Sequence, residues 1–287
     1  MIVIVILIGI CLLYLWMIHP QNLKAEKWEG FRHHYYAHRG LHDAQSNIPE
    51  NSIAAFLKAV ENGYGIELDV QLTKDGTPVV FHDIKTGRLL RDEKGAIVNK
   101  VLTELTLEEL QRYHLLTSKE QVPLFEDVLK LVDGKVPLIV ELKVANSSMD
   151  TSALCSKSDL LLQKYHGLYC VESFHPACVN WYCKNRPEII RGQLAEHPNA
   201  QAKGKMFFAT RIMQYLLTNF ITRPNFIAYN HHNRHNLSRM LCHRLFKNPA
   251  IAWTIRSQQE LEDNRKYFDY FIFEHFIPNV ESSSEEQ

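Results

Sequence analysis

The sequence predicts an α/β fold in which parallel strands close into a barrel, and two observations support this prediction. Short β-rich runs alternate with helical patterns through most of the chain, which is typical of a parallel sheet covered by helices. When an apolar segment over residues 1–18 and a polar connector over residues 19–34 are set aside, 253 of the 287 residues remain. That length suits a single α/β barrel, so a second domain is not required.

Composition narrows the class of protein further. Lys and Arg number 32 and Asp and Glu also number 32, and this zero net charge disfavours a nucleic-acid-binding protein. The chain has six Cys without a CxxC pair, and five of them, an odd number, follow the apolar segment. Free thiols in a reducing compartment are therefore the simplest interpretation, and a disulfide scaffold is disfavoured.

The first eighteen residues carry no charge and predict one N-terminal transmembrane helix, which makes the membrane a predicted partner. A helix of this length reaches about 27 Å, close to the thickness of the hydrocarbon core. A cleaved signal peptide is disfavoured because a positive start and small residues before a cut are both missing. Lys24, Lys27 and Arg32 follow the segment, so we expect a single-pass protein with its catalytic body on the cytoplasmic side.

The body over residues 35–281 contains nine strand-like runs, which compete for the eight positions of a barrel. The gap between Val70 and Pro78 is too short for a helical crossover. Either the barrel is irregular there or one run lies outside it. The predicted strands are Tyr35–Arg39, Ile66–Val70, Pro78–His82, Val136–Leu142, Leu168–Ser173, Glu188–Leu194, Asn225–Tyr229, Ala250–Ile255 and Asp269–Glu274.

Helical patterns fall between most of these runs, and Ser52 and Ser257 are suitable N-caps for two of them. Residues 83–122 break the alternation and contain a turn and a separate helix start of their own, so we interpret them as a small insertion after the third strand. Residues 282–287 form a polar tail. The predicted helices are Ser52–Glu61, Leu124–Val132, Asp150–Tyr165, Pro176–Lys184, Leu237–Phe246 and Ser257–Arg265.

Charged and imidazole side chains gather where four of the strands end. Glu67 and Asp69 are two residues apart and therefore point to the same side of one strand, as do Glu141 and Lys143 on another. The active site of an α/β barrel lies at the carboxyl ends of its strands, so we expect these groups to converge. The four groups are His38-Arg39, Glu67 with Asp69, His82-Asp83, and Glu141 with Lys143.

This set of residue types indicates the metal-assisted cleavage of a phosphodiester. Three carboxylates can share one hard cation, for which oxygen ligands favour Mg²⁺ or Ca²⁺ over Zn²⁺. Two His can serve as acid and base near neutral pH, and Arg39 and Lys143 can offset the charge of a phosphate. Any one strand-end carboxylate is more often part of a loop salt bridge, so the prediction depends on the combined pattern.

The order and spacing of six motifs from about Tyr36 to Lys143 resemble the glycerophosphodiester phosphodiesterase family. The resemblance implies an irregular TIM (β/α)₈ barrel with a small insertion after the His-Asp strand, which agrees with the odd stretch after His82. The motifs are His38-Arg39-Gly40, Pro49-Glu50-Asn51-Ser52, Glu67-Leu68-Asp69-Val70, Thr73-Lys74-Asp75-Gly76, His82-Asp83 and Glu141-Leu142-Lys143.

The resemblance also implies a role for each of these residues. His38 and His82 would be the catalytic acid–base pair, while Arg39 and Lys143 would contact the phosphate. One divalent cation would be bound by Glu67, Asp69 and Glu141. Glu50 would lie close to the metal and Arg39, and Phe174 and Trp253 would line the pocket, although each of these two aromatic residues is as readily a core residue. Two departures stand out, namely Ser52 where the family usually has Thr, and Phe273-Glu274-His275 where it usually has Thr-Asp.

We therefore expect metal-dependent hydrolysis of glycerophosphodiesters to sn-glycerol 3-phosphate and an alcohol. Two alternatives are a phospholipase D-like or phosphatidylinositol-cleaving enzyme that acts on intact lipids, and a non-catalytic membrane binding module on the same fold. The sequence leaves open the head group, Mg²⁺ or Ca²⁺, which His is the acid, water or the substrate 2-hydroxyl as nucleophile, and the oligomeric state. Residues 230–235 also suggest a metal cluster, but they contain no carboxylate, so a loop at the barrel mouth is favoured.

Overall fold

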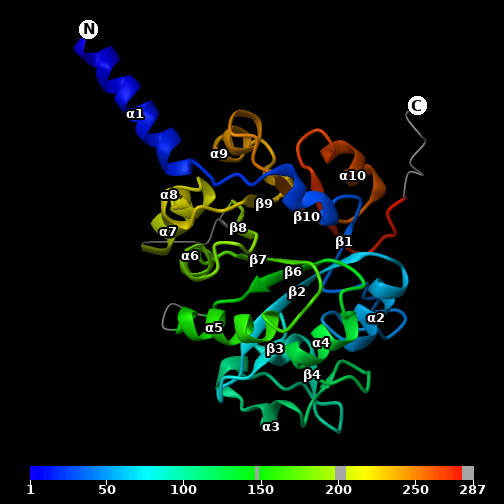
Figure 1. The fold of residues 1–287 in the computed structure, drawn as a ribbon. Coiled ribbons are helices and arrows are strands. Elements are labelled where there is room, and N and C mark those ends of the chain that lie inside the picture. The colour runs from blue at the N-terminus through cyan, green and yellow to red at the C-terminus, as the bar shows by residue number, and fades with distance from the viewer. Residues whose placement is uncertain (146–148, 198–204, 280–287) are drawn as a thin grey trace.

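The computed structural model describes residues 1–145, 149–197 and 205–279, and within them eight parallel strands close into a ring, which confirms the predicted barrel (Figure 1). The ring closes because the first strand pairs in parallel with both the second and the last. In ring order the strands are β1 (Tyr36–His38), β2 (Gly65–Leu72), β6 (Leu138–Leu142), β7 (Tyr169–Ser173), β8 (Arg191–Ala195), β9 (Phe226–Asn230), β10 (Ala250–Ile255) and β11 (Tyr270–Phe273).

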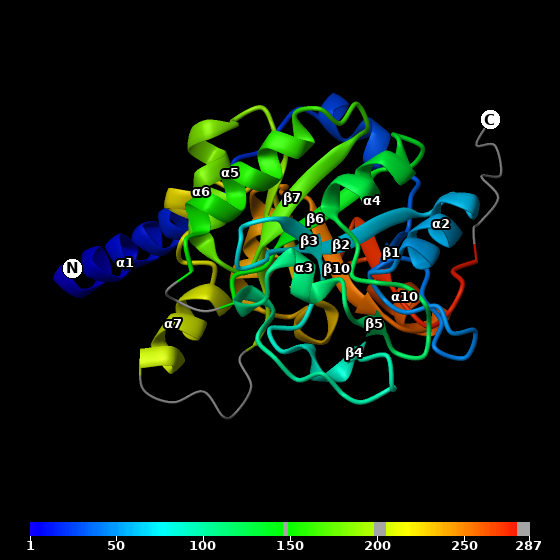
Figure 2. The same ribbon diagram turned by 90° about the horizontal axis from the view of Figure 1, so that it is seen from below.

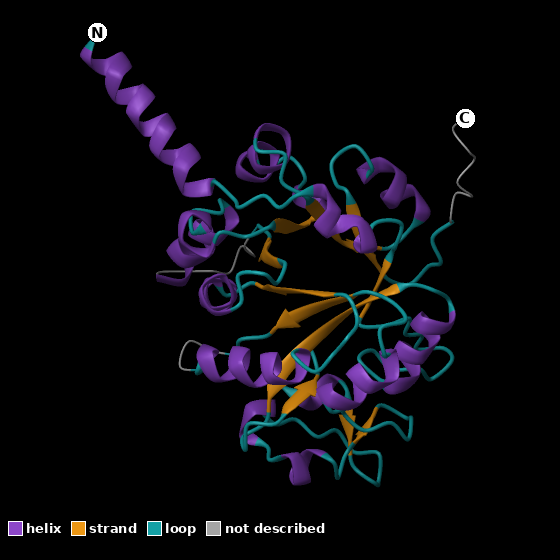
Figure 3. Ribbon diagram, in the orientation of Figure 1, coloured by secondary structure: helices purple, strands orange, loops and turns teal. Residues whose placement is uncertain are grey.

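Helices follow the ring strands and cover the outside of the barrel (Figure 3). α4 shows why they pack there, because Phe125, Val128, Leu129 and Val132 form one buried stripe along it. The predicted N-caps are confirmed, since the Ser52 and Ser257 hydroxyls accept hydrogen bonds from the helices that they precede. The helices are α2 (Ile53–Glu61), α4 (Phe125–Val132), α5 (Thr151–Leu162), α6 (Pro176–Asn185), α7 (Lys205–Gln214), α8 (Asn219–Thr222), α9 (Leu237–Met240), the π-helical turn η5 (Leu241–Leu245) and α10 (Gln258–Asn264).

The ninth strand-like run lies outside the ring. β3 (Pro78–Val80) pairs antiparallel with β2 and turns back after residues 73–77, where the Thr73 N–H donates to the Thr77 carbonyl at 3.0 Å. Such a short connection permits only an antiparallel return. The irregularity that the sequence predicts between Val70 and Pro78 is therefore a hairpin beside the barrel.

The stretch predicted as an insertion, residues 83–122, follows this third strand in chain order. It contains the antiparallel pair β4 (Leu90–Arg91) and β5 (His114–Leu115). A separate hydrophobic cluster, which includes Leu90, Leu102 and Leu115, packs it against Val79 and Phe81. Its short helical segments are η2 (Thr86–Arg88), η3 (Leu102–Glu104) and α3 (Leu107–Leu110).

The inside of the barrel is apolar toward the amino ends of the strands. Tyr36, Phe226 and Ile272 belong to one buried cluster there, together with Trp28 and Phe31. The last two side chains come from η1 (Ala25–Phe31), a 3₁₀ helix within the stretch predicted as a polar connector. This helix closes the amino end of the barrel and leaves the opposite end for the polar residues.

The apolar segment forms α1 (Ile2–Ile18), which projects away from the barrel in both views (Figures 1 and 2). Its 17 residues span about 26 Å, and its last turns are attached to the barrel. The Tyr14 hydroxyl lies 2.7 Å from Ser238 Oγ, and Asn219 donates to the Ile18 carbonyl at 2.9 Å.

Among the described residues, no helix has both the length and the apolar character needed to cross a membrane. The predicted transmembrane helix over residues 1–18 is therefore not supported. The polar tail predicted for residues 282–287 lies outside the described residues.

Candidate active site

Three buried carboxylates meet at the carboxyl end of the barrel. Glu67 and Asp69 lie on β2 and Glu141 lies on β6, where Asp69 and Glu141 are register partners. One oxygen from each of the three lies within 4.8 Å of the others, and Asp69 Oδ1 is buried without a hydrogen bond from any described residue. Oxygen-only donors in this arrangement fit a hard divalent cation.

The charges of this triad are strongly coupled to their surroundings. Burial raises the pKa of Glu67 well above its usual range, and the neighbouring carboxylates Asp69 and Glu141 raise it further. Burial also raises the pKa of Asp69, but Lys143, His82 and Arg39 outweigh it and hold that pKa far below the usual range. Within the triad, the surroundings thus favour the ionised form of Asp69 and the protonated form of Glu67.

Arg39 and Lys143 supply positive charge at the edge of the triad. Lys143 Nζ lies 3.0 Å from Glu141 and 3.3 Å from Asp69, and Arg39 Nε lies 3.4 Å from Asp69. The Arg39 side chain also donates to Glu50 at 2.6 Å, and its backbone N–H donates to Glu67 at 3.1 Å. Both cations thus lie close enough to contact a phosphate held at the triad.

Glu50 lies beside Arg39, as the resemblance implies, and it also joins a second arginine that the motifs do not include. Arg88 donates to Glu50 at 2.6 Å and to Asp83 at 2.7 Å. Burial raises the pKa of Glu50, but the hydrogen bond from Arg88 and the charge of Arg39 lower it to about 2. Arg88 lies in the stretch predicted as an insertion, and no sequence motif marked it.

His38, at the end of β1, is held by a carboxylate that directly follows the last strand of the ring. Its Nδ1 lies 2.5 Å from Glu274 Oε2, while its Nε2 lies 3.9 Å from Glu67. Burial lowers the pKa of His38 to about 4, although the hydrogen bond with Glu274 raises it in part. The imidazole is therefore neutral at neutral pH, with the Nδ1 proton directed at Glu274 and the Nε2 lone pair facing the triad.

Glu274 is a residue of this cluster that no sequence motif predicts. The sequence showed only that Phe273-Glu274-His275 departs from the usual family ending. An acid directly after the last barrel strand was the available signal, because that position lies beside the first strand once the ring closes. Arg256 fixes the other Glu274 oxygen at 2.7 Å, so the His38 partner is itself anchored.

His82 follows β3 and reaches the site from outside the ring. Its Nδ1 lies 2.7 Å from Asp83 Oδ1, so both His side chains pair the same nitrogen with a carboxylate. Burial raises the pKa of Asp83, but hydrogen bonds from His82 and Arg88 outweigh it and keep the group ionised. The Gln71 amide holds the segment by donating to the carbonyls of Phe81, His82 and Asp83.

A cavity of about 760 Å³ opens beside His82, Glu141 and Lys143. Phe174 lines it and meets Trp253 edge to face, with ring centroids 5.5 Å apart. Much of the remaining wall is apolar, including Ile84, Val144, Ile212 and Met213. A larger hollow of about 1120 Å³ lies at the amino end of the barrel, beside η1, and none of the predicted site residues lines it.

Glu172 is a further buried acid that none of the six sequence motifs places at the site. It lies on β7 as the register partner of Glu141, and its side chain is buried. Burial raises its pKa well above the usual range, and Glu141 and Asp69 raise it further. The alternation along β7 could have revealed it, because Cys170 and Glu172 face the same side of that strand.

Fold and site together define a TIM-type barrel with an acidic, imidazole-flanked pocket at the carboxyl ends of its strands. Residues 38–265 match the glycerophosphoryl diester phosphodiesterase family, and the chain belongs to that family. A glycerophosphodiester phosphodiesterase of Bacillus altitudinis is 33% identical over 163 residues, which cover 54% of this chain and 63% of that protein. The chain thus matches less than two thirds of the length of this relative.

Solved structures show the same fold at lower identity. A crystal structure from Silicibacter pomeroyi has a TM-score of 0.70 at 17% identity, covering 88% of this chain and 95% of that one. A phosphodiesterase of Oleispira antarctica, solved with the product sn-glycerol-3-phosphate, has a TM-score of 0.66 at 20% identity and covers 86% of this chain and 94% of that one.

Proposed function

We propose that this protein hydrolyses glycerophosphodiesters to sn-glycerol 3-phosphate and an alcohol in a metal-dependent reaction. The observation that carries the proposal is a triad of buried carboxylates flanked by two imidazoles, each held by a carboxylate through Nδ1. Family membership supports it, as does the bound product in the structure of the Oleispira antarctica relative.

Glu67, Asp69 and Glu141 would hold one divalent cation, Mg²⁺ or Ca²⁺. When bound, such an ion supplies Lewis acidity toward a phosphoryl oxygen. Arg39 and Lys143 would bind the remaining phosphoryl oxygens and stabilise the charge that grows on them during the reaction. Phe174 and Trp253 would form the wall next to the glycerol or head group.

The two imidazoles would divide the proton transfers between them. We assign the general base to His38, because its low pKa keeps Nε2 free to accept a proton and Glu274 stabilises the imidazolium that results. His82 would donate a proton to the leaving alkoxide, with Asp83 holding its ring in place. In one turnover, His38 would take up a proton and His82 would release one. A proton exchange with solvent would then return both side chains to their starting state.

The attacking hydroxyl belongs either to water or to the 2-position of the substrate glycerol. A glycerophosphodiester that lacks the 2-hydroxyl separates the two routes. Direct attack by water leaves this analogue a substrate, whereas attack by the 2-hydroxyl through a cyclic phosphate leaves it uncleaved. The measurement is product release from matched substrates with and without that hydroxyl.

A second candidate function is favoured by the apolar wall of the cavity. Ile84, Val144, Ile212 and Met213 offer a surface that suits an acyl chain better than a small polar head group. Phosphodiesters that keep one or both acyl chains, including phosphatidylinositol, would then be substrates. A side-by-side assay of deacylated, singly acylated and intact lipids tests this second function. The glycerophosphodiester activity predicts that the deacylated compounds are cleaved fastest.

We also propose that α1 contacts a lipid surface and that the barrel lies on the cytoplasmic side. Support comes from exposed, uncharged side chains such as Ile6 and Ile10, which are 55% and 58% exposed. The six cysteines are free, which agrees with a reducing compartment. Cosedimentation with phosphatidylcholine vesicles is expected for the full chain and is expected to fail for the double variant Ile6→Glu/Ile10→Glu.

The hydrolysis itself is tested on the full chain with glycerophosphocholine and glycerophosphoethanolamine. We expect release of sn-glycerol 3-phosphate with added Mg²⁺ or Ca²⁺, no release after chelation, and about a 10²- to 10⁴-fold loss in His38→Ala. Glu67→Gln should also lose activity, while the exposed His33→Ala serves as the matched control. Activity that survives chelation contradicts the proposal, and metal binding without turnover of any phosphodiester favours a binding module.

A further inference from the structure

A second group of potential metal ligands lies at the end of β9, away from the carboxylate triad. His231 and His232 stand in the 3₁₀ turn η4 (His231–Asn233), and Glu260 reaches them from α10. One ligand atom of each lies within 4.8 Å of the other two. The sequence showed this histidine run without a carboxylate, and the packing of α10 supplies the missing one.

The His231 side chain gives the clearest evidence that this group of residues could bind a ligand. Its side chain is 4% exposed, and its buried Nε2 has no hydrogen-bond partner in the described ranges. The nearest carboxylate oxygen, Glu260 Oε2, is 3.8 Å away, which is too far for a hydrogen bond. Two ligands of one tetrahedral zinc ion lie roughly 3.4 Å apart, so this separation suits a shared ion after a small adjustment.

A small cavity of about 240 Å³ is present at this point, and His231, His232 and Glu260 all line it. The two imidazole rings are 3.9 Å apart, a spacing that disfavours two imidazolium charges. Burial lowers the pKa of His231 to about 4, with the adjacent His232 lowering it further. The His231 ring is therefore neutral near pH 7, which is the form that binds metals.

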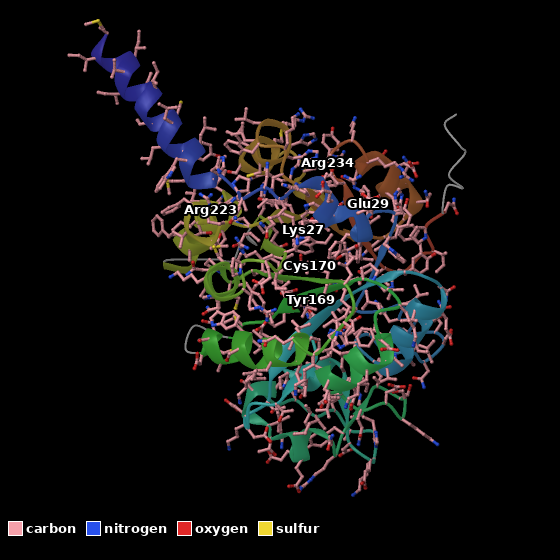
Figure 4. The ribbon with its side chains drawn as sticks, viewed as in Figure 1. Lys27, Glu29, Tyr169, Cys170, Arg223 and Arg234 are labelled. Carbon is pink, nitrogen blue, oxygen red and sulfur yellow. The ribbon has the colours of Figure 1, made fainter. Side chains whose placement is uncertain are left out.

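The arginines around this cavity are engaged with other groups. Arg234, labelled in Figure 4, donates to Asn264 at 3.3 Å and lies over the Tyr267 ring at 5.1 Å. Arg256 directs its guanidinium to Glu274, while its backbone N–H donates to Glu260 Oε2 at 2.7 Å. This backbone contact orients Glu260 through Oε2, which is also its oxygen nearest His231. A carboxylate oxygen has two lone pairs, so Oε2 can accept this hydrogen bond and still bind an ion.

We propose that His231, His232 and Glu260 form a second metal site, selective for Zn²⁺ or a similar transition ion, with one coordination position left to water. Two imidazoles and one carboxylate favour such an ion, whereas the oxygen-only triad in the barrel favours Mg²⁺ or Ca²⁺. Ligation through Nε2 would place the His231 proton on Nδ1, which lies 3.4 Å from the Asn264 side-chain nitrogen. The ion would join the end of β9 to the start of α10.

The test is a Zn²⁺ titration of the full chain in excess Mg²⁺, which keeps the barrel triad occupied. Wild-type protein is expected to bind one Zn²⁺, and His232→Ala and Glu260→Gln are expected to bind it at least about 10-fold more weakly. His232 is exposed and Glu260→Gln keeps an oxygen for the Arg256 N–H, so both variants are expected to fold. His235→Ala is the matched control, because His235 lines the same cavity but packs against Tyr267.

Substitution with Co²⁺ gives a second reading that does not depend on enzyme activity. A tetrahedral site with imidazole ligands gives strong visible absorption, whereas Co²⁺ bound at six oxygens gives little. We expect this absorption in wild type and in Glu67→Gln, and its loss in Glu260→Gln. Equal Zn²⁺ affinity in all variants, or binding that is lost in Glu67→Gln and kept in Glu260→Gln, would overturn the proposal.

Discussion

Each imidazole of the site is held at Nδ1 by a carboxylate, but the two carboxylates differ in their setting. Asp83 is the chain neighbour of His82, whereas Glu274 reaches His38 from the opposite end of the sequence. Glu274 is also fixed by Arg256. We therefore propose that Glu274 is a positioning residue, which would act on the reaction through His38.

Replacement of this carboxylate by an amide should change both the rate and its dependence on pH. In Glu274→Gln we expect kcat to fall about 100-fold, because the His38 ring loses its fixed orientation. The Glu274 contact raises the pKa of His38, so its loss lowers that pKa further below 4. The acid limb of kcat/KM, where His38 becomes protonated, should then move to lower pH, which a pH–rate profile measures.

The pH of the acid limb distinguishes a role of Glu274 in orienting His38 from a purely structural role of Glu274. If Glu274 only held the last strand in place, Glu274→Gln would lower the rate without moving the acid limb. Arg256→Gln provides a comparison, because it releases one Glu274 oxygen but keeps the carboxylate beside His38. An acid limb that stays in place in Glu274→Gln would contradict the assignment.

Asn51 supports the triad from outside the set of proposed ligands. Its Nδ2 donates to Asp69 Oδ2 at 2.8 Å, and its backbone has a left-handed φ of 53°. Asn tolerates this conformation better than most residues do, which explains its place directly before the N-cap of α2. One residue thus satisfies a backbone requirement and orients a carboxylate.

Two substitutions at Asn51 separate these contributions. Asn51→Gly keeps the backbone conformation and removes the hydrogen bond, so we expect weaker Mg²⁺ binding with stability near that of wild type. Asn51→Ala should weaken Mg²⁺ binding equally and cost roughly 1–2 kcal/mol more in the free energy of unfolding than Asn51→Gly. Calorimetric titration and denaturant unfolding measure the two effects. Unchanged Mg²⁺ affinity in both variants would show that Asp69 does not need this contact.

At the level of helices, the start of α2 was predicted from one hydroxyl. Ser52 Oγ accepts from the Ala55 N–H at 3.1 Å and donates to the Pro49 carbonyl at 2.7 Å. Ser52→Ala should therefore lower the free energy of unfolding by about 1 kcal/mol, measured by urea denaturation. Ser52→Thr, which keeps the hydroxyl, is the control. A cost in Ser52→Thr as large as that in Ser52→Ala would mean that packing, not capping, determines this position.

The strands were predictable because their patterns are local. Ile66–Val70 alternates apolar and acidic residues within five positions, and that alternation already placed Glu67 and Asp69 on one face. The pairing of β3 was not predictable to the same degree, since its apolar run suits a ring strand equally well. Only the length of the turn between Leu72 and Pro78 indicates that β3 lies outside the ring of parallel strands.

Contacts between distant parts of the chain explain what the sequence did not reveal. Glu274 meets His38 only because the ring closes, and Glu260 meets His231 only because α10 packs beside the end of β9. Neither pair has a characteristic spacing. The apolar segment over residues 1–18 shows how local composition can mislead. Its composition predicts a membrane span, whereas Ile18 in its last turn is buried against the barrel.

The residues that stabilise the barrel and the residues of the proposed site lie toward opposite ends of its axis. Apolar side chains such as Tyr36, Phe226 and Ile272 occupy the inside toward the amino ends of the strands, while Glu67 and Glu141 lie nearer the carboxyl ends. Burying carboxylates without compensating charge lowers the free energy of unfolding. The apolar packing at the amino end of the barrel has to offset that loss. η1 completes that apolar half from outside the ring.

Trp28 of η1 should therefore contribute to stability without taking part in the reaction. Its side chain is 4% exposed and packs against Phe31, Phe226 and Tyr270. Trp28→Ala is expected to lower the free energy of unfolding by about 3–5 kcal/mol, because it leaves a cavity at the amino end of the barrel. KM for glycerophosphocholine should stay near that of wild type, since the proposed substrate site lies at the other end of the barrel.

The neighbouring Lys27, labelled in Figure 4, provides the control, because it is an exposed residue of the same helix. Lys27→Ala should change the free energy of unfolding by no more than about 0.5 kcal/mol. Denaturant unfolding and steady-state kinetics on both variants make the comparison. If Trp28→Ala unfolded at the same denaturant concentration as Lys27→Ala, η1 would be a loosely attached connector, and the barrel would be stable without it.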